Sequence, residues 1–263
     1  MIRSLVCVVC LSLSSLALAD KAAEKPPSAD SIMQKVEDRS QGKDQTATHS
    51  LVIIPKNGTK RFRSYTLMRK EYDDVIKMVT FLSAPTDVRG AAFMVWDNKK
   101  ADDQRWIYLP SIGQVRRLVV GDARQSFFGS DFVFEDFTNR DPDQDEHKLV
   151  GSQKVDSWDC WVIESKPKSD KGLDFASYKT WVWKQSNMLV RQELYDSQGK
   201  VTRRLQAKSI EDVQGIPTYK QVTVSNLKTG SESRIEITDV KYNAGIADER
   251  FDEAQLQRGA PTK

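Results

Sequence analysis

Residues 106–138 read WIYLPSIGQVRRLVVGDARQSFFGSDFVFEDFT, and the rest of the chain is best interpreted from this stretch. Its first part alternates like a strand up to Pro110 and resumes after Gly113, a pattern typical of a β-hairpin. After Gly121 the alternation ends, and a run of phenylalanines follows. These are Phe127, Phe128, Phe132, Phe134 and Phe137. The stretch therefore places a large aromatic surface on irregular backbone.

Two hypotheses account for these phenylalanines. They form a plug that fills the protein's own core, or a movable lid over a cavity that holds the hydrocarbon of another molecule. Taken alone, the sequence favours the plug, because clustered aromatic side chains are most often simply buried.

Three motifs in the stretch resemble those of the LolA-like outer-membrane lipoprotein-sorting protein family. They are Tyr108-Leu109-Pro110, Val115-Arg116-Arg117 and the block FFGSDFVFEDF at residues 127–137. The resemblance extends in layout over nearly all of the mature chain, although its specific motifs lie in the central third. Family members often have a small hydroxyl residue and a tyrosine where this chain has Val133 and Phe134, so this block is more apolar.

The resemblance implies a mainly β fold: an open, curved antiparallel β-barrel, or half-barrel, with short helices covering the concave face. It also implies a periplasmic protein that carries or senses acylated molecules, and it favours the lid over the plug. The lid would then consist of the five phenylalanines. Arg116 and Arg117 would anchor this lid or bind a lipid head group, unless they only keep a strand edge soluble.

In the lid hypothesis, the concave face lines a lipid-binding cavity. The expected lining residues are Phe93, Trp96, Trp106, Tyr108, Leu118, Trp161, Trp181 and Trp183. Which side of each strand faces inward stays open at this point, because an error of one residue in register reverses it.

The N-terminal region predicts export. Residues 1–19 are expected to be a signal peptide, because Arg3 precedes an apolar run that ends in Ala17-Leu18-Ala19. Residues 20–28 are expected to be a flexible leader, and residues 29–263 a single LolA-like lipid-binding domain. No later stretch reaches the roughly 18 apolar residues that cross a bilayer. The expected location is the periplasm.

The charge balance argues against nucleic-acid binding. The chain has 40 Lys and Arg against 37 Asp and Glu, and removal of the signal peptide takes away only Arg3. Such a nearly neutral chain lacks the basic stripe of a nucleic-acid-binding protein. Cys160 is the only cysteine after the signal peptide, and its alternation with Trp158 and Val162 predicts a buried, unpaired thiol.

One helix is expected near the N-terminus. Ser31-Ile32-Met33-Gln34 has the pattern of a capping box, and the helix should end before Gly42. Its apolar stripe, which includes Val36, packs on the convex face or covers the mouth of the barrel; the resemblance favours the mouth.

From Thr46 onward, strand patterns alternate with turn signals such as Asn57-Gly58, which predicts a barrel or sandwich. The expected strands are residues 46–54, 60–70, 74–82, 91–97, 104–109, 115–120, 156–166, 178–184, 188–195, 201–213, 218–226 and 232–242. Residues 140–147 predict a solvated turn rather than a calcium loop, because Glu146 stands where such a loop needs glycine. Residues 248–257 predict one or two helical turns held by Phe251 and Leu256.

Catalytic chemistry has little support in the sequence. His49 and His147 lie among polar residues and are expected at the surface, and no Gly-x-Ser-x-Gly elbow, Walker loop or dinucleotide motif is present. Asp131, Glu135 and Asp136 could form an acid/base pair. More often such carboxylates cap short helices or pair with basic residues, here Arg116, Arg117 or Arg124. We therefore expect no enzymatic activity, cofactor or metal.

The preferred function is a periplasmic carrier that shuttles a lipid or a lipoprotein acyl chain from the inner toward the outer membrane. Each methylene moved into an apolar cavity contributes about 0.8 kcal/mol, so one acyl chain supplies the binding energy. The resemblance suggests an inner-membrane exporter of the RND (resistance-nodulation-division) class and an outer-membrane acceptor as partners. We expect a monomer with transient membrane contact. The alternative is a regulatory binding module that senses lipid or a mislocalised lipoprotein without transport; a third hypothesis is hydrolysis through Asp131 or Glu135.

Overall fold

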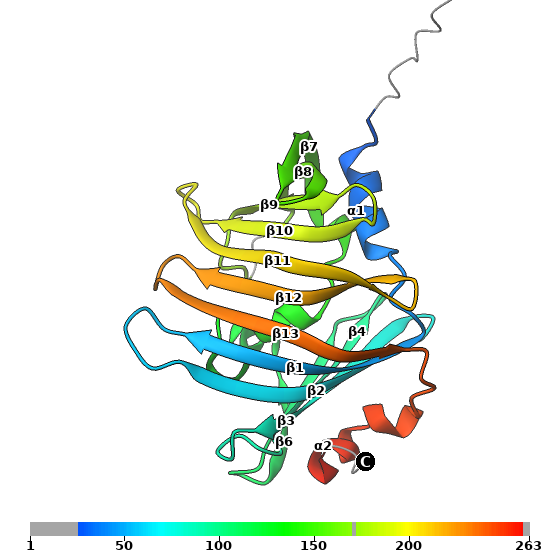
Figure 1. Cartoon of the computed structure of the whole chain (residues 1–263), viewed down its shortest axis with the longest axis vertical. Helices are drawn as coiled ribbons and strands as arrows, with labels where there is room; N and C mark the ends of the chain where they lie inside the picture. The colour runs from blue at the N-terminus through cyan, green and yellow to red at the C-terminus, as the bar shows by residue number, and fades with distance from the viewer. Residues whose placement is uncertain (1–25, 170–171, 260–263) are drawn as a thin grey trace, which may run out of the picture.

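The computed structural model describes residues 26–169 and 172–259. The expected signal peptide and most of the expected leader lie outside the described residues. The chain forms one antiparallel sheet of 13 strands in the order β6-β5-β4-β3-β2-β1-β13-β12-β11-β10-β9-β8-β7 (Figure 1). The sheet is strongly curved but not closed, because β6 and β7 are its two edges. The expected open, curved antiparallel fold is confirmed.

The strands of the first half are β1 (Asp44–Ile54), β2 (Arg61–Glu71), β3 (Val75–Ala84), β4 (Ala92–Asn98), β5 (Gln104–Leu109) and β6 (Gln114–Leu118). Those of the second half are β7 (Asp145–Val155), β8 (Trp158–Pro167), β9 (Ser177–Trp183), β10 (Met188–Tyr195), β11 (Val201–Val213), β12 (Ile216–Asn226) and β13 (Ser231–Tyr242). Strands that are consecutive in sequence pair with each other, except that β6 and β7 do not, and β1 also pairs with β13. The connection from β6 to β7 crosses the concave face.

Both faces of the sheet are covered with apolar side chains, as β3 illustrates. Met78 and Leu82 belong to the cluster on the concave face, which includes the phenylalanines between β6 and β7. Val79 and Phe81 point to the convex face and pack against the C-terminal helix. The two-sided apolar pattern of this strand therefore reflects burial on both faces.

The N-terminal helix α1 (Ala29–Glu37) begins earlier than expected. Its N-cap is Ser28, whose Oγ accepts a hydrogen bond from the backbone N–H of Ser31 at 3.1 Å, so the predicted capping box at Ser31 is wrong. Ile32 and Met33 are buried against β8 and β9, as the periodicity indicates. The strand register places this contact on the concave side of the sheet, at the end opposite β6.

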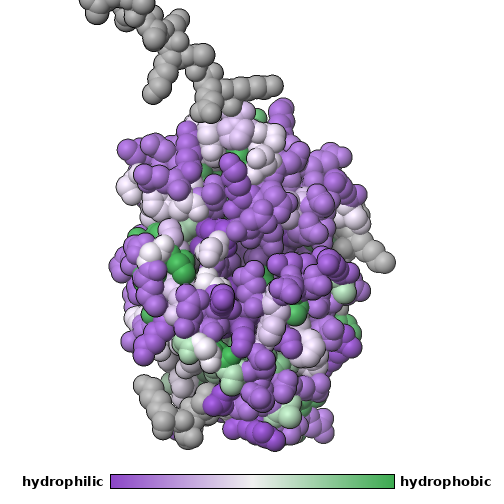
Figure 2. All heavy atoms as spheres, turned by 90° about the vertical axis from the view of Figure 1, so that its right-hand side faces the viewer, coloured by the Kyte–Doolittle hydropathy of each residue, from purple (hydrophilic) through white to green (hydrophobic). Residues whose placement is uncertain are grey.

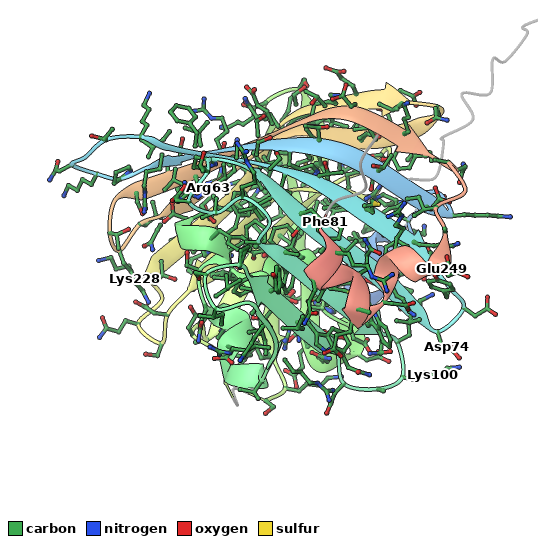
Figure 3. The ribbon with its side chains drawn as sticks, turned by 90° about the horizontal axis from the view of Figure 1, so that it is seen from below. Arg63, Asp74, Phe81, Lys100, Lys228 and Glu249 are labelled. Carbon is green, nitrogen blue, oxygen red and sulfur yellow. The ribbon has the colours of Figure 1, made fainter. Side chains whose placement is uncertain are left out.

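The C-terminal region covers the convex face. A 3-10 helix (Asp248–Phe251) leads into α2 (Glu253–Arg258), and the side chains of Phe251 and Leu256 are fully buried, as predicted. They pack beside Phe81, which Figure 3 shows next to α2. Neither of the two α-helices in the described residues has the length and apolar character needed to cross a bilayer.

Two polar segments differ from the expectation. Residues 145–155, which the sequence pattern leaves without a strand, form the edge strand β7. Asp145, expected in a solvated turn, is buried and accepts hydrogen bonds from Arg140 and from the Tyr178 hydroxyl. The charged residues around Asp145 indicate an exposed turn. Its burial cannot be predicted from them, because its partner Tyr178 is distant in the sequence.

The histidines are also less exposed than expected. His49 is buried on the concave face of β1, where its Nδ1 lies 3.0 Å from the Tyr65 hydroxyl. His147 is half-buried and contacts Ser165. The alternation of a strand sends side chains inward even when the neighbouring residues are polar, so the predicted surface positions are wrong. The prediction for Cys160 is confirmed, because this thiol is buried and free.

Candidate functional site

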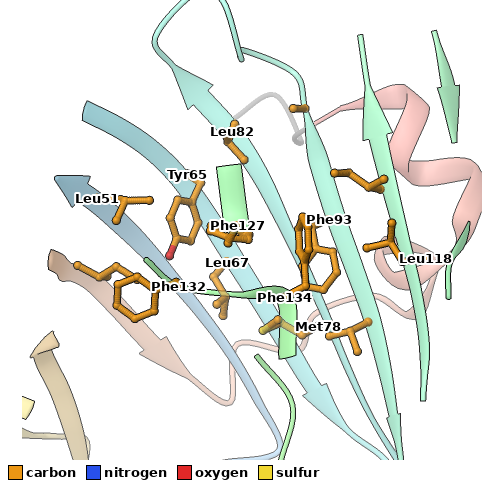
Figure 4. Close-up of a cluster of buried hydrophobic side chains, with 14 of the residues drawn as sticks. Leu51, Tyr65, Leu67, Met78, Leu82, Phe93, Leu118, Phe127, Phe132 and Phe134 are labelled. Carbon is orange, nitrogen blue, oxygen red and sulfur yellow. The ribbon is translucent and has the colours of Figure 1, made fainter. Parts of the chain in front are cut away.

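The candidate site is the phenylalanine segment, residues 126–138, where it lies on the concave face (Figure 4). Phe127, Phe132 and Phe134 are buried, whereas Phe128 and Phe137 are half-buried. The ring centroids of Phe127 and Phe137 lie 4.4 Å apart, and those of Phe93 and Phe134 lie 4.8 Å apart. The segment thus fills the hollow of the sheet with its own aromatic rings.

The backbone of the segment forms a tight reversal. Phe127 N–H donates to the Phe132 carbonyl at 2.7 Å, and the Ser130 hydroxyl donates to the Phe127 carbonyl at 2.7 Å. Phe128 has φ 48° and ψ 41°, in the left-handed region that a bulky residue rarely occupies. Such a conformation costs on the order of 1 kcal/mol, so the packed position of the segment is held against some backbone strain.

Asp131 joins the segment to β13. Its carboxylate accepts hydrogen bonds from the hydroxyls of Ser231 at 2.5 Å and Ser233 at 2.7 Å. Its backbone N–H donates to the Ser233 hydroxyl at 2.9 Å. Three short polar contacts therefore meet at one residue of the tip.

Two arginines provide further anchors. Arg203 on β11 forms an ion pair with Asp136 and donates to the Asp131 carbonyl at 3.1 Å. Arg61 on β2 donates to the Gly129 carbonyl at 3.2 Å. The sequence gives no local signal for these anchors, because they lie more than 60 residues from the segment in the chain.

The acidic residues of the segment have structural partners. Glu135 pairs with Arg124 at 3.2 Å, and Asp136 accepts a hydrogen bond from Val133 N–H at the start of the 3-10 helix Phe134–Phe137. A helix cap and a pair with Arg124 are among the contacts that the sequence predicts for these carboxylates. Arg116 and Arg117 are exposed on the edge strand β6, and neither forms an ion pair within the described residues. Arg117 instead lies over the Trp106 ring, 5.9 Å from its centroid.

The eight residues expected to line a cavity are distributed over both faces. Phe93 and Leu118 share the concave cluster with the phenylalanine segment. Trp96, Trp106 and Tyr108 belong to the convex cluster around α2. Trp181 and Trp183 pack with Trp158, and Trp161 packs with α1. Phe93 and Leu118 are therefore the two that the structure brings to the phenylalanine segment.

The concave face also has residues that the sequence analysis does not single out. They are Leu51, Tyr65, Leu67, Met78, Val95, Ile107, Val224 and Ile235. Most of them are aliphatic residues in ordinary strand patterns. A prediction of lining residues that relies mainly on aromatic side chains does not identify them. Strand register is the signal that identifies them, and it depends on pairings between distant strands.

A polar cleft of about 1990 Å³ opens at the end of the sheet where β2 and β4 finish. Figure 2 shows this side of the molecule as largely hydrophilic, with a hollow near its centre. Arg69, Asp97 and Arg105 line the cleft, and Asp97 accepts a hydrogen bond from Asn139 N–H at 2.9 Å. Burial raises the pKa of Asp97 to about 6. The cleft mixes acidic and basic side chains, so it does not provide an apolar cavity for an acyl chain.

Comparison with known proteins places this geometry among related folds. A family model described only as an uncharacterized protein matches residues 74–258, more than half of the chain. A DUF1329 family protein from Desulfovibrio piger is 26% identical, with 87% of this chain and 97% of that chain covered and a TM-score of 0.81. No curated protein matches the sequence.

Two further structures share the fold at lower identity. A domain from Vibrio parahaemolyticus, described as an outer membrane lipoprotein-sorting protein, is 23% identical, covers 88% of this chain and 98% of its own, and has a TM-score of 0.81. A LolA superfamily protein from Nitrosomonas europaea is 17% identical, covers 88% of this chain and 100% of its own, and has a TM-score of 0.67.

Proposed function

The chain belongs to a LolA-like family, and on that premise we propose that it is a binding protein for an acyl chain, which enters the concave face when the phenylalanine segment leaves it. The ligand is a lipid or the acyl chain of a lipoprotein. The proposal assigns no catalytic step to the protein.

One observation carries this proposal: the core of the concave face is completed by a segment that belongs to no strand of the sheet. The surface beneath Phe127 and Phe134 is apolar on both halves of the sheet, with Leu67 and Phe93 on one and Val224 on the other. An acyl chain and a set of phenylalanine rings satisfy such a surface equally well, because hydrophobic burial is not directional. Exchange of one for the other therefore conserves most of the buried apolar area.

The energetics favour exchange over simple opening. An empty concave face would lose the burial of several phenylalanines, each about 1.5–3 kcal/mol. An acyl chain returns about 0.8 kcal/mol for each buried methylene, so a chain of ordinary length replaces the lost burial. The segment is thus expected to stay closed in the free protein and to open when a ligand is present.

The cellular role follows from the same premise. The expected signal peptide and the family resemblance support a periplasmic location and transfer of the ligand from the inner toward the outer membrane. An exporter of the RND class would load the carrier, because a soluble protein has no energy source of its own. The lipoprotein-sorting description of the Vibrio parahaemolyticus domain supports an acylated cargo.

A disulfide that locks the segment tests the proposal. Asp131 and Ser233 already touch in the closed structure, so the double variant Asp131→Cys/Ser233→Cys is expected to form a disulfide on oxidation. The oxidised protein should fail to bind cis-parinaric acid, a fluorescent fatty acid. The same protein after reduction should bind it.

The reduced double variant controls for the two substitutions, and oxidised Ser233→Cys alone controls for the oxidant. Circular dichroism should give the same strand signal in all samples. Equal binding by the oxidised and reduced double variant would contradict the proposal, because it would place the ligand elsewhere than beneath the segment.

A further inference from the structure

Two hairpins lie side by side at the end of the sheet opposite the polar cleft. Residues 55–60 connect β1 to β2, and residues 227–230 connect β12 to β13. Because β1 pairs with both β2 and β13, the hairpins are neighbours, and the Lys56 side chain packs over Gly230. Figure 1 shows both at the left edge of the molecule, and Figure 3 places Lys228 at the end remote from Asp74 and Lys100. We call these two loops and Arg61-Phe62 the hairpin end.

The hairpin end is basic. Lys56, Lys60, Arg61 and Lys228 are exposed, and none of them forms an ion pair within the part of the chain that the structure describes. Arg89, on the adjoining β3–β4 connection, is also exposed. The acidic residues nearby already have partners. Asp87 lies 4.0 Å from Arg63, Glu232 pairs with Arg234 at 3.3 Å, and Asp131 accepts hydrogen bonds from Ser231 and Ser233. The basic charges of the hairpin end are therefore available to an anionic partner.

Large apolar side chains project from the same end. Phe62 is 61% exposed and Leu227 is 41% exposed, and Ile112 at the tip of the β5–β6 hairpin is 50% exposed. These are three of the five large hydrophobic residues that are exposed in the described chain. Phe62 lies near the start of β2, whereas Leu227 and Ile112 lie in two separate hairpin connections, so they come from three different places in the sheet.

We propose that the hairpin end docks on the surface of a lipid bilayer that contains anionic lipids. Lysine and arginine near such a surface are attracted by its negative potential, and aromatic rings insert at the boundary between head groups and acyl chains. A surface that binds a protein usually has a continuous apolar core surrounded by a polar rim. The hairpin end instead has separate apolar side chains among cations, which suits the anionic head groups and acyl chains of a membrane surface.

The position of the hairpin end extends the proposed function to the membrane surface, and this part of the inference rests on that proposed function. Arg61, a residue of the hairpin end, donates to the Gly129 carbonyl at the tip of the phenylalanine segment. Ser231 and Ser233, which directly follow the second hairpin, bind Asp131 at the same tip. Docking would therefore bring the tip of the segment to the bilayer surface. Lipid phosphates there would compete with Gly129 for Arg61, and an acyl chain could pass between protein and membrane without crossing water.

Sedimentation with vesicles tests the docking surface. The mature protein should bind vesicles of phosphatidylcholine that contain about a third phosphatidylglycerol, and should bind pure phosphatidylcholine vesicles far more weakly. The triple variant Lys56→Gln/Lys60→Gln/Lys228→Gln should bind the anionic vesicles about a hundredfold more weakly. The matched variant Lys154→Gln/Lys208→Gln/Lys241→Gln makes the same change in net charge at exposed lysines outside the hairpin end, and its binding should be almost unchanged.

Insertion is measured separately with an environment-sensitive fluorophore on Phe62→Cys. The buried native thiol Cys160, whose pKa is raised to about 11 by burial, should not react with the label. The emission should shift to the blue on anionic vesicles, whereas the same label on Thr238→Cys, an exposed position within β13, should not respond.

Equal loss of vesicle binding in both triple variants would overturn the proposal, because it would show a general charge effect. No binding to anionic vesicles at low ionic strength would also overturn it, and the hairpin end would then be a surface for an acidic protein. Vesicle binding requires neither segment opening nor a bound acyl chain, so these outcomes are independent of the disulfide-lock experiment.

Discussion

Arg203 is the residue whose side chain joins the tip of the phenylalanine segment to the 3-10 helix that follows it. Its guanidinium reaches the carboxylate of Asp136 and the backbone carbonyl of Asp131, and both ends of the ion pair are largely buried. A hydrogen bond to a charged group contributes about 1.5–3 kcal/mol to stability, which is more than a hydrogen bond between neutral groups contributes. The closed position of the segment should therefore depend strongly on this single side chain.

Replacement of this side chain by Arg203→Gln should strengthen ligand binding. If the closed segment competes with the ligand, a weaker anchor raises the open fraction, and the apparent affinity for cis-parinaric acid should rise about tenfold. Fluorescence titration measures this change. Arg204→Gln is the control, because Arg204 pairs with Glu193 at 2.8 Å and, among the residues that the structure describes, forms no hydrogen bond or ion pair with the segment. Unchanged affinity in Arg203→Gln would mean that closure does not compete with binding.

His49 should make the protein less stable in acid. Burial lowers the pKa of His49 to about 3, below its usual 6.5, so the unfolded chain binds a proton that the folded chain does not. The stability from this group is present above about pH 6.5 and is lost as the pH falls toward the folded pKa. Between about pH 6.5 and about pH 5 the loss should reach about 2 kcal/mol relative to His49→Gln, measured by urea unfolding.

Asp97 should have the opposite dependence. Its pKa is raised to about 6 by burial, so the folded chain binds a proton more readily than the unfolded chain. Its contribution is present below the unfolded pKa and is lost as the pH rises toward about 6. Comparison with Asp97→Asn separates this effect from that of His49. A wild-type and variant difference that did not change with pH would contradict the assignment.

Among the elements, α2 is short but well anchored. Leu256 is fully buried on the convex face with Phe81 and Phe251, so Leu256→Ala should lower the free energy of unfolding by about 2–4 kcal/mol through lost burial and a cavity. Urea denaturation measures the change. Gln257→Ala, at an exposed position of the same helix, should leave stability nearly unchanged. Similar values for both variants would mean that α2 is only loosely attached.

Most strands could be predicted from the sequence, because their alternation and turn residues are local signals. β10 and β11 have the expected bounds, and the helical turns at Phe251 and Leu256 are where the pattern places them. β7 could not be predicted in this way, because its residues are mostly polar and exposed at a sheet edge. They therefore lack the apolar alternation on which such predictions depend.

The candidate site was predicted only in part. The phenylalanines and the pairing of Glu135 with Arg124 follow from neighbouring residues in the sequence. The anchors Arg203 and Ser233 do not, since a contact between β11 or β13 and the segment depends on the curvature of the whole sheet. Aromatic content mainly determines which residues are predicted to line a cavity, but strand register determines the face on which each one lies. Trp96 and Trp106 therefore lie on the convex face, contrary to the prediction.

For the molecule as a whole, transfer between membranes distinguishes a carrier from a sensor. A carrier should move a fluorescent lipid from donor to acceptor vesicles at a rate proportional to protein concentration, and the oxidised Asp131→Cys/Ser233→Cys variant should be inactive. A sensor should bind the lipid without accelerating transfer. Dequenching of the lipid measures the rate, and the reduced double variant is the control. Binding without accelerated transfer would favour the regulatory alternative.

The pairing of β1 with β13 joins two meanders at a single seam, one made of β1–β6 and the other of β7–β13. The phenylalanine segment lies within the connection between them, residues 119–144, and contributes no strand to the sheet. A protease that cuts within the segment should therefore leave two fragments that remain associated through the seam. The same topology predicts that a circular permutant, with its new ends inside the segment and its old ends joined, should still fold. Backbone continuity should therefore be dispensable at the candidate site, whereas a break within either meander should disrupt the pairing of its strands.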